Sequence, residues 1–244
     1  MPERASATVC PRSEFFQRLL EITDTTVLGP VLPSLAMKKL WDISPPVDVG
    51  SPVFPGDTPY QQTWAARIGQ DCPVNVSAIT LSPHVGAHAD APLHYDPQGQ
   101  AIGALALAPY LGPCRVVHAI GVGPLVRLSH LAHALEGLPP RLLVRTCERM
   151  PQNQFDTQLC AFDPKLVHTL AARGVQLLGI DSASIDPAES KTLPSHQAVR
   201  AHGLRVLENL CLDAVPEGDY ELIALPLKLM SADASPVRAV LREL

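Results

Sequence analysis

The sequence lacks the features that would favour nucleic acids or membranes as partners. Lys and Arg together number 19 against 24 Asp and Glu in 244 residues, the formal net charge is −5, and no basic cluster occurs. Such a chain offers little positive charge to a phosphate backbone or an anionic membrane surface. No stretch approaches the roughly 18 consecutive apolar residues of a membrane span. No basic segment followed by an apolar one opens the chain, so no secretory signal is predicted. We expect a cytoplasmic protein.

Paired cysteine motifs are also missing. The six cysteines form no C-x-x-C pair, and a chain of this size without a signal peptide is not expected to depend on disulfides. We therefore expect buried, reduced thiols. The residues concerned are Cys10, Cys72, Cys114, Cys147, Cys160 and Cys211.

What the sequence does contain is typical of a globular protein rich in loops. Apolar residues make up 46% and charged residues 18%, whereas the 25 prolines are about twice the usual share of roughly 5%. Proline fixes φ and removes a donor, which favours short elements. Residues 1–36 carry mixed charge without strand alternation and are predicted to be a poorly ordered N-terminal extension. The alternative is a short helix on the domain surface. Residues 37–244 are predicted to form the main folded domain.

Patterns along the chain predict an α/β fold with a mixed sheet, because strands dominate the first half and alternate with helices in the second. Residues 203–215 hold a further extended run. The predicted helices are Ser129–Leu135, capped by Ser129, and Pro164–Ala172. The predicted strands are Leu40–Ile43, Asn75–Leu81, Cys114–Ile120, Arg141–Arg145, Val175–Ile180 and Tyr220–Leu225.

The segment from Ser82 to His94 carries the clearest chemical signal. Three histidines and one aspartate fall within eleven residues of it. Pro83, Gly86 and Pro92 make a continuous helix improbable, so we expect a loop after the strand 75–81. Imidazole nitrogen and carboxylate oxygen are ligands that Zn²⁺ prefers and that Mn²⁺ and Fe²⁺ accept. The sequence thus predicts a catalytic metal site with an open position for water. Its candidate protein ligands are His84, His88 and Asp90.

Two residues far downstream have no such signal of their own. On one straight helix His196 and Glu208 would stand roughly 18 Å apart, at 1.5 Å per residue, on different faces. Gly203 offers a break that would let the chain return. Taken alone, both residues read as ordinary surface side chains. The remaining histidines, for which we expect no functional role, are His118, His130, His133, His168 and His202.

The whole motif resembles the H-x-G-[TA]-H-x-D-x-P-x-H signature of the cyclase-type metal hydrolases, and within them the bacterial kynurenine formamidases. The similarity spans essentially Met37 to Leu244. Matching segments beyond the motif are Trp41–Pro46, Phe54–Pro59, Pro73–Val76, Leu93–Tyr95, Gly112–Arg115, Gly179–Ser182, Ser190–Leu193, Pro226–Lys228 and Asp233–Arg238.

This resemblance implies a specific site, fold and reaction. It implies a homodimer with a cyclase-like α/β fold, whose mixed, barrel-like sheet has flanking helices. The implied reaction is hydrolysis of N-formyl-L-kynurenine to L-kynurenine and formate in tryptophan degradation by the kynurenine pathway. Two divalent ions, most often Zn²⁺, are implied, with Asp90 bridging them and His94 acting as the acid/base. The implied ligands are His84, His88 and Asp90 for the first ion, and Asp90, His196 and Glu208 for the second.

The sequence departs from the family pattern in two places, and the second leaves the substrate open. Val85 and Ala87 stand in the histidine segment where relatives often have Thr, which should alter the hydrogen bonds around the ligands but not the ligands themselves. Phe54 stands where these relatives usually carry a Trp that contacts the substrate, and Phe offers a smaller aromatic face without an indole N–H. We expect Phe54 to contact an aryl formamide. Hydrolysis of another cyclic or aryl amide, such as isatin, is the first alternative. A non-catalytic metal-binding or ligand-binding protein that retains the fold is the second. The sequence does not place Asp181, Ser184 or Lys228 relative to a substrate.

Overall fold

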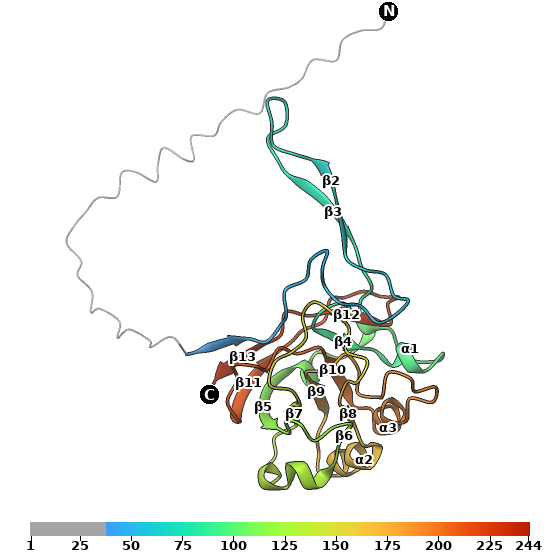
Figure 1. The fold of residues 1–244 in the computed structure, drawn as a ribbon, viewed down its shortest axis with the longest axis vertical. Coiled ribbons are helices and arrows are strands. Elements are labelled where there is room, and N and C mark those ends of the chain that lie inside the picture. The colour runs from blue at the N-terminus through green and yellow to red at the C-terminus, as the bar shows by residue number, and fades with distance from the viewer. Residues whose placement is uncertain (1–37) are drawn as a thin grey trace, which may run out of the picture. The chain divides into compact units, whose positions relative to one another are not determined.

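The computed structural model describes residues 38–244, so the predicted extension 1–36 lies outside the described residues. Its centre is a nine-stranded sheet in which the middle strands run parallel and the strands on both flanks run antiparallel (Figure 1). In spatial order the strands are β1 (Leu40–Asp42), β13 (Val240–Glu243), β11 (Gly218–Ile223), β5 (Leu111–His118), β7 (Arg141–Arg145), β9 (Leu177–Ile180), β10 (Arg205–Glu208), β4 (His88–Asp90) and β12 (Ala234–Pro236).

Helices and small strand pairs surround this sheet. The α-helices are α1 (Pro92–Tyr95), α2 (Pro164–Ala172) and α3 (Pro194–His202), and three 3₁₀ helices cover Ile102–Ala104, Ala108–Tyr110 and Leu128–Ala134. Strands β6 (Leu125–Val126) and β8 (Ala161–Phe162) form a short parallel pair. Strands β2 (Gln61–Ala66) and β3 (Val76–Thr80) form an antiparallel hairpin that extends away from the nine-stranded sheet (Figure 1).

The core lies on both faces of the parallel strands. Successive strand residues point to opposite faces, and in β7 this sends Leu143 into one apolar cluster and Leu142 and Val144 into the other. The second cluster includes Leu170 of α2 and Val199 of α3. Burial on both faces explains why the central strands read as continuous apolar runs rather than as alternating ones.

Local sequence signals set several of the predicted boundaries. The predicted bounds Arg141–Arg145 and Pro164–Ala172 match β7 and α2. In α2, Pro164 occupies the first turn and the Asp163 side chain accepts a hydrogen bond from Lys165 N, which is the usual start of a helix. The expected helix 129–135 is instead a 3₁₀ helix that begins at Leu128. Ser129 is therefore not its cap, and Nδ1 of His130 accepts from Arg127 N at 3.1 Å.

The expectation of a loop from Ser82 to His94 is only partly right. Residues 81–87 are irregular, but His88–Asp90 form strand β4 and Pro92–Tyr95 form helix α1. Strand β4 pairs with β10 on one side and β12 on the other, and both partners lie far away in the sequence. Proline is well tolerated in the first turn of a helix, so Pro92 starts α1 rather than breaking it. Strands β2, β6, β8, β12 and β13 were not predicted at all.

The cysteines in the described part of the chain are free thiols, but most of them are not fully buried. Cys114 is buried, whereas Cys72, Cys147, Cys160 and Cys211 are partly exposed; Cys10 lies outside the described residues. The expectation of buried thiols is therefore wrong for four of them, which sit in loops or at strand ends instead of in the core. Within residues 38–244, no helix has the length and apolar character needed to cross a lipid bilayer.

Candidate active site

Strand β4 directs two of the candidate ligands to the same face of the sheet. Side chains two residues apart on a strand share a face, so His88 and Asp90 point together while Ala89 packs in the core on the opposite side. On the neighbouring antiparallel strand β10, Glu208 is paired with His88. Residues directly opposite each other in such a pair lie side by side on one face, which brings Glu208 to the same cluster.

His196 reaches this cluster because the chain reverses between α3 and β10. Helix α3 ends at His202, and Gly203 adopts a left-handed conformation with φ of 65°, which glycine accommodates without strain. The straight helix that would separate His196 from Glu208 therefore does not form. Nε2 of His196 lies 3.5 Å from Oε1 of Glu208.

The two carboxylate oxygens of Asp90 face different histidines. Oδ1 lies 3.2 Å from Nδ1 of His84 and 3.4 Å from Nε2 of His88. Oδ2 lies 3.2 Å from Nε2 of His196. Glu208 adds its second oxygen, Oε2, at 3.4 Å from Nε2 of His88. The fold thus brings the five predicted metal ligands together, with the carboxylate of Asp90 at the centre.

Two atoms in this cluster are buried without a hydrogen-bond partner in the described structure. They are Nε2 of His88 and Oδ1 of Asp90, and burying a polar atom without a partner is costly. Both are atom types that bind zinc, and His84, His88 and Asp90 have ligand atoms within 4.8 Å of one another. The donor set therefore fits a divalent cation such as Zn²⁺.

The charges in the cluster shift one another's pKa values in opposite directions. Burial would lower the pKa of His88, but the adjacent carboxylates of Asp90 and Glu208 outweigh it and raise that pKa to about 10. Burial would raise the pKa of Asp90, but the adjacent imidazoles of His196, His84 and His88 hold it well below its ordinary value. Without a metal, the carboxylates are therefore neutralised by protonated imidazoles.

The ligand side chains are themselves held by neighbours. Nδ1 of His88 lies 2.9 Å from the Gly86 carbonyl oxygen, so this nitrogen donates while Nε2 faces the cluster. The backbone N–H of Ile185 donates to Oε1 of Glu208 at 2.7 Å. The buried carboxylate of Asp186 contacts Nδ1 of His196 at 2.8 Å. Asp186 was not singled out from the sequence, because nothing local marks it as lying beside His196.

His94 lies next to the cluster, on helix α1. Its ring centroid is 4.4 Å from that of His84, and its Nδ1 is 3.3 Å from Oδ2 of Asp233. The same oxygen of Asp233 is 3.1 Å from Nε2 of His84. Asp233 lies in one of the segments that resemble the family, yet only the fold reveals that it contacts both histidines.

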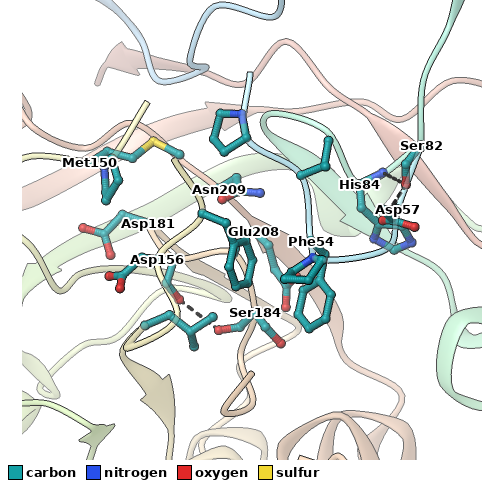
Figure 2. Close-up of a pocket in the computed structure, with 18 of the residues that line it drawn as sticks. Phe54, Asp57, Ser82, His84, Met150, Asp156, Asp181, Ser184, Glu208 and Asn209 are labelled. Carbon is teal, nitrogen blue, oxygen red and sulfur yellow. Dashed lines mark hydrogen bonds between the residues drawn. The ribbon is translucent and has the colours of Figure 1, made fainter. Parts of the chain in front are cut away.

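A cavity of about 1040 Å³ opens beside these residues. Its lining includes His84, His94, His196 and Glu208, together with Phe54. Figure 2 shows Phe54 extending over this hollow, with His84 and Glu208 nearby. The ring of Phe54 makes an edge contact with that of Phe155, with centroids 5.0 Å apart. Phe155 was not identified from the sequence.

The residues that the sequence left unplaced have different settings. Asp181 is 2% exposed and accepts hydrogen bonds from the backbone N–H and hydroxyl groups of Thr146, which anchors the cavity wall. Ser184 lines the cavity (Figure 2). Lys228 is exposed and is not among the residues that line the cavity.

Comparison with known proteins identifies relatives that match along nearly their whole length. The family model described as "Putative cyclase" matches residues 41–187. The kynurenine formamidase of Paracidovorax citrulli is 67% identical over 209 residues, which cover 84% of this chain and 97% of that protein. The kynurenine formamidase of Bordetella pertussis is 66% identical over 208 residues, which cover 85% of this chain and 100% of that protein.

Solved structures with the same fold support this grouping. A protein described as a potential metal-dependent hydrolase with cyclase activity matches with a TM-score of 0.73 at 26% identity, covering 84% of this chain and 98% of that one. A predicted metal-dependent hydrolase from Bacillus stearothermophilus matches with a TM-score of 0.72 at 27% identity, covering 86% of this chain and 100% of that one. The predicted α/β cyclase-like fold with a mixed sheet is thus confirmed. The chain belongs to the cyclase family of hydrolases and, within it, to the kynurenine formamidases.

Proposed function

We propose that this protein hydrolyses N-formyl-L-kynurenine to L-kynurenine and formate, in tryptophan degradation by the kynurenine pathway. The observation that carries the proposal is the pair of buried, unpartnered ligand atoms on His88 and Asp90, in a chain that is 67% identical to a kynurenine formamidase. The adjoining cavity of about 1040 Å³ has room for an aryl formamide. We also propose that the enzyme acts in the cytoplasm.

The ligand cluster supports a site for two divalent ions, which we propose to be Zn²⁺. The two oxygens of Asp90 face opposite groups of histidines, as expected for a carboxylate shared by two cations. When bound, such ions lower the pKa of water toward ~7 and stabilise negative charge on a carbonyl oxygen. The proposed ligands are His84, His88 and Asp90 for one ion, and Asp90, His196 and Glu208 for the other.

His94 is the proposed acid/base. In the overall reaction, the oxygen of water adds to the formyl carbon, the C–N bond breaks, and the aryl nitrogen leaves as the amine. The departing nitrogen needs a proton, and imidazole is suited to provide it because its unperturbed pKa is near the working pH. Asp233, at 3.3 Å from Nδ1 of His94, orients the ring so that Nε2 is the nitrogen that exchanges the proton.

Phe54 is the proposed contact for the aryl ring of the substrate. It lines the cavity, is 40% exposed, and packs edge-on against Phe155. A partly exposed aromatic pair beside a polar cluster offers an apolar surface for the ring while the formamide lies toward the histidines.

A homodimer is proposed from the family resemblance and from the hairpin β2–β3. An isolated two-stranded hairpin is only marginally stable in water. This one nevertheless carries Trp64 and Ile79 at 45% and 57% exposure, and contiguous exposed apolar groups often mark protein interfaces. A second copy of the chain is the occupant we propose for this surface.

The proposed function is tested by turnover measured with metal content in the same sample. The purified protein should release L-kynurenine from N-formyl-L-kynurenine, lose this activity on chelation, and regain it with Zn²⁺. Isatin should be hydrolysed poorly or not at all, and preferential turnover of isatin would contradict the proposal. Asp90→Ala should lose both metal and activity, because one carboxylate serves both ions. Unchanged metal content in that variant would contradict the bridging role.

A further inference from the structure

Asp186 is a buried carboxylate that accepts several hydrogen bonds close to the proposed metal site. It is 0% exposed. It accepts hydrogen bonds from the backbone N–H of Ser195 at 2.8 Å and from that of His196 at 2.9 Å. Its Oδ2 also lies 2.8 Å from Nδ1 of His196. A buried charge needs such partners, so the position of this carboxylate is closely fixed.

Asp186 also replaces a missing cap at the start of α3. The N–H groups in the first turn of a helix have no partner within the helix. The N-cap residue, Leu193, contributes no side-chain hydrogen bond and has a positive φ of 46°. Asp186 satisfies two of these N–H groups from outside the helix. One carboxylate thus anchors both the backbone and the ring of His196.

This arrangement selects which nitrogen of His196 faces the ligand cluster. A carboxylate can only accept, so Nδ1 of His196 must carry the proton. Nε2 is left facing Oδ2 of Asp90 at 3.2 Å. Partners of this kind commonly fix the tautomer and the ring orientation of metal-binding histidines.

The neighbouring residue holds the other ligand on the same side. The backbone N–H of Ile185, next to Asp186 in the chain, donates to Glu208 at 2.7 Å. The segment Ile185–Asp186 therefore contacts both His196 and Glu208. On the other side of Asp90, His88 is held separately by the Gly86 carbonyl.

We propose that Asp186 is a positioning residue for the second metal site, holding Nε2 of His196 toward Asp90 and Glu208. The inference rests on the proposed two-ion function. It predicts that the two ions are affected differently. Loss of Asp186 should weaken binding of the ion that His196 holds and leave unchanged the binding of the ion held by His84 and His88.

The test is a zinc titration of the metal-free full-length protein against a chelator of known affinity, with bound equivalents counted by native mass spectrometry. Wild type should bind two equivalents. Asp186→Asn should bind the first with wild-type affinity and the second about 10- to 100-fold more weakly. If this variant does not fold, Asp186→Glu, which displaces the carboxylate by one methylene, should show the same selective loss.

Ser195→Ala is the matched control at the same helix start. It removes the hydrogen bond from the Ser195 hydroxyl to the Phe162 carbonyl, 2.8 Å long, without touching the imidazole. It should lower the melting temperature while leaving both zinc affinities unchanged. Equal loss of zinc in Ser195→Ala, or wild-type affinity for both equivalents in the Asp186 variant, would overturn the inference. A wild type that binds fewer than two equivalents or does not hydrolyse the formamide would instead refute the proposed function.

Discussion

The histidines and carboxylates of the ligand cluster compensate one another's burial. His88 is 0% and Asp90 1% exposed, so each charge depends on its neighbours for stabilisation. The other histidines lie elsewhere, as the sequence led us to expect. His118 contacts the Val215 carbonyl, and the side chains of His168 and His202 contact each other. None of these three is among the residues that line the cavity.

The role of His94 can be separated from metal binding. His94→Ala should keep its zinc and lose turnover by roughly 10²- to 10⁴-fold, the usual range for removal of a general acid or base. The rate constant kcat and the zinc content of the same preparation check this. Full activity with bound zinc would exclude His94 as the acid/base.

Phe54, which stands where the relatives usually carry a Trp, gives a second prediction for a single side chain. Phe54→Trp should leave metal content unchanged and alter KM for aryl formamides, because indole presents a larger ring and an N–H donor. Steady-state kinetics with N-formyl-L-kynurenine provide the measurement. If both kcat and KM stayed at wild-type values, Phe54 would not contact the substrate.

Helix α1 illustrates how an element positions a functional side chain. It carries His94, and Gly99 packs directly against its first turn. A Cβ on Gly99 would lie 2.3 Å from the carbonyl carbon of Pro92, which is backbone and cannot rotate away. The short helix and the loop that follows it are therefore closely packed.

Gly99→Ala should consequently displace α1. We expect a loss of about 1–3 kcal/mol in the free energy of unfolding, as for other overpacked sites, together with reduced turnover. Urea denaturation and kcat test the two effects. Gly69→Ala is the control, because the nearest atom to its added Cβ is 4.0 Å away. Equal stability of both variants would mean that α1 moves without cost.

At the scale of the whole molecule, the hairpin β2–β3 bears on the oligomeric state. If a second copy covers its apolar side chains, Ile79→Asp should shift the protein from dimer to monomer, because a buried carboxylate would be left without a partner. Sedimentation velocity on wild type and variant measures this. Gln61→Asp, which places the same charge at an exposed polar position on the other face of the hairpin, is the comparison. A monomeric wild type would contradict the proposed homodimer.

Metal binding should change the pH dependence of stability. In the metal-free protein the pKa of His88 is raised from 6.5 to about 10, so its stabilising contribution is complete below pH 6.5 and is lost as the pH rises through 10. The pKa of Asp90 is lowered from 3.8, so its contribution is present above that pH and is lost as the pH falls. The metal-free protein should therefore be less stable at pH 9 than at pH 6.

Zinc should stabilise the protein more at the higher pH, because imidazoles must lose a proton to bind it. Melting temperatures from pH 5 to 9, with and without Zn²⁺, measure both trends. If the increase in melting temperature caused by Zn²⁺ were the same at every pH, the assignment of the histidines as ligands would be contradicted.

The sequence by itself determined the features that depend on neighbouring residues. Helix α2 begins at Pro164 because Asp163 caps it locally, and the density of donors from His84 to His94 pointed to a metal. The apolar run of β7 marked a strand. The link from this segment to His196 and Glu208 came from the resemblance to the family and not from any local pattern.

Only the tertiary structure decided how those donors converge. Asp90 and His196 are 106 residues apart, and β4 is a strand because β10 and β12 supply its hydrogen bonds. Asp186, Asp233 and Phe155 acquire their settings in the same way, from partners that are remote in the chain. Backbone pairing and burial act between segments that fold together, so no local pattern could have assigned these contacts.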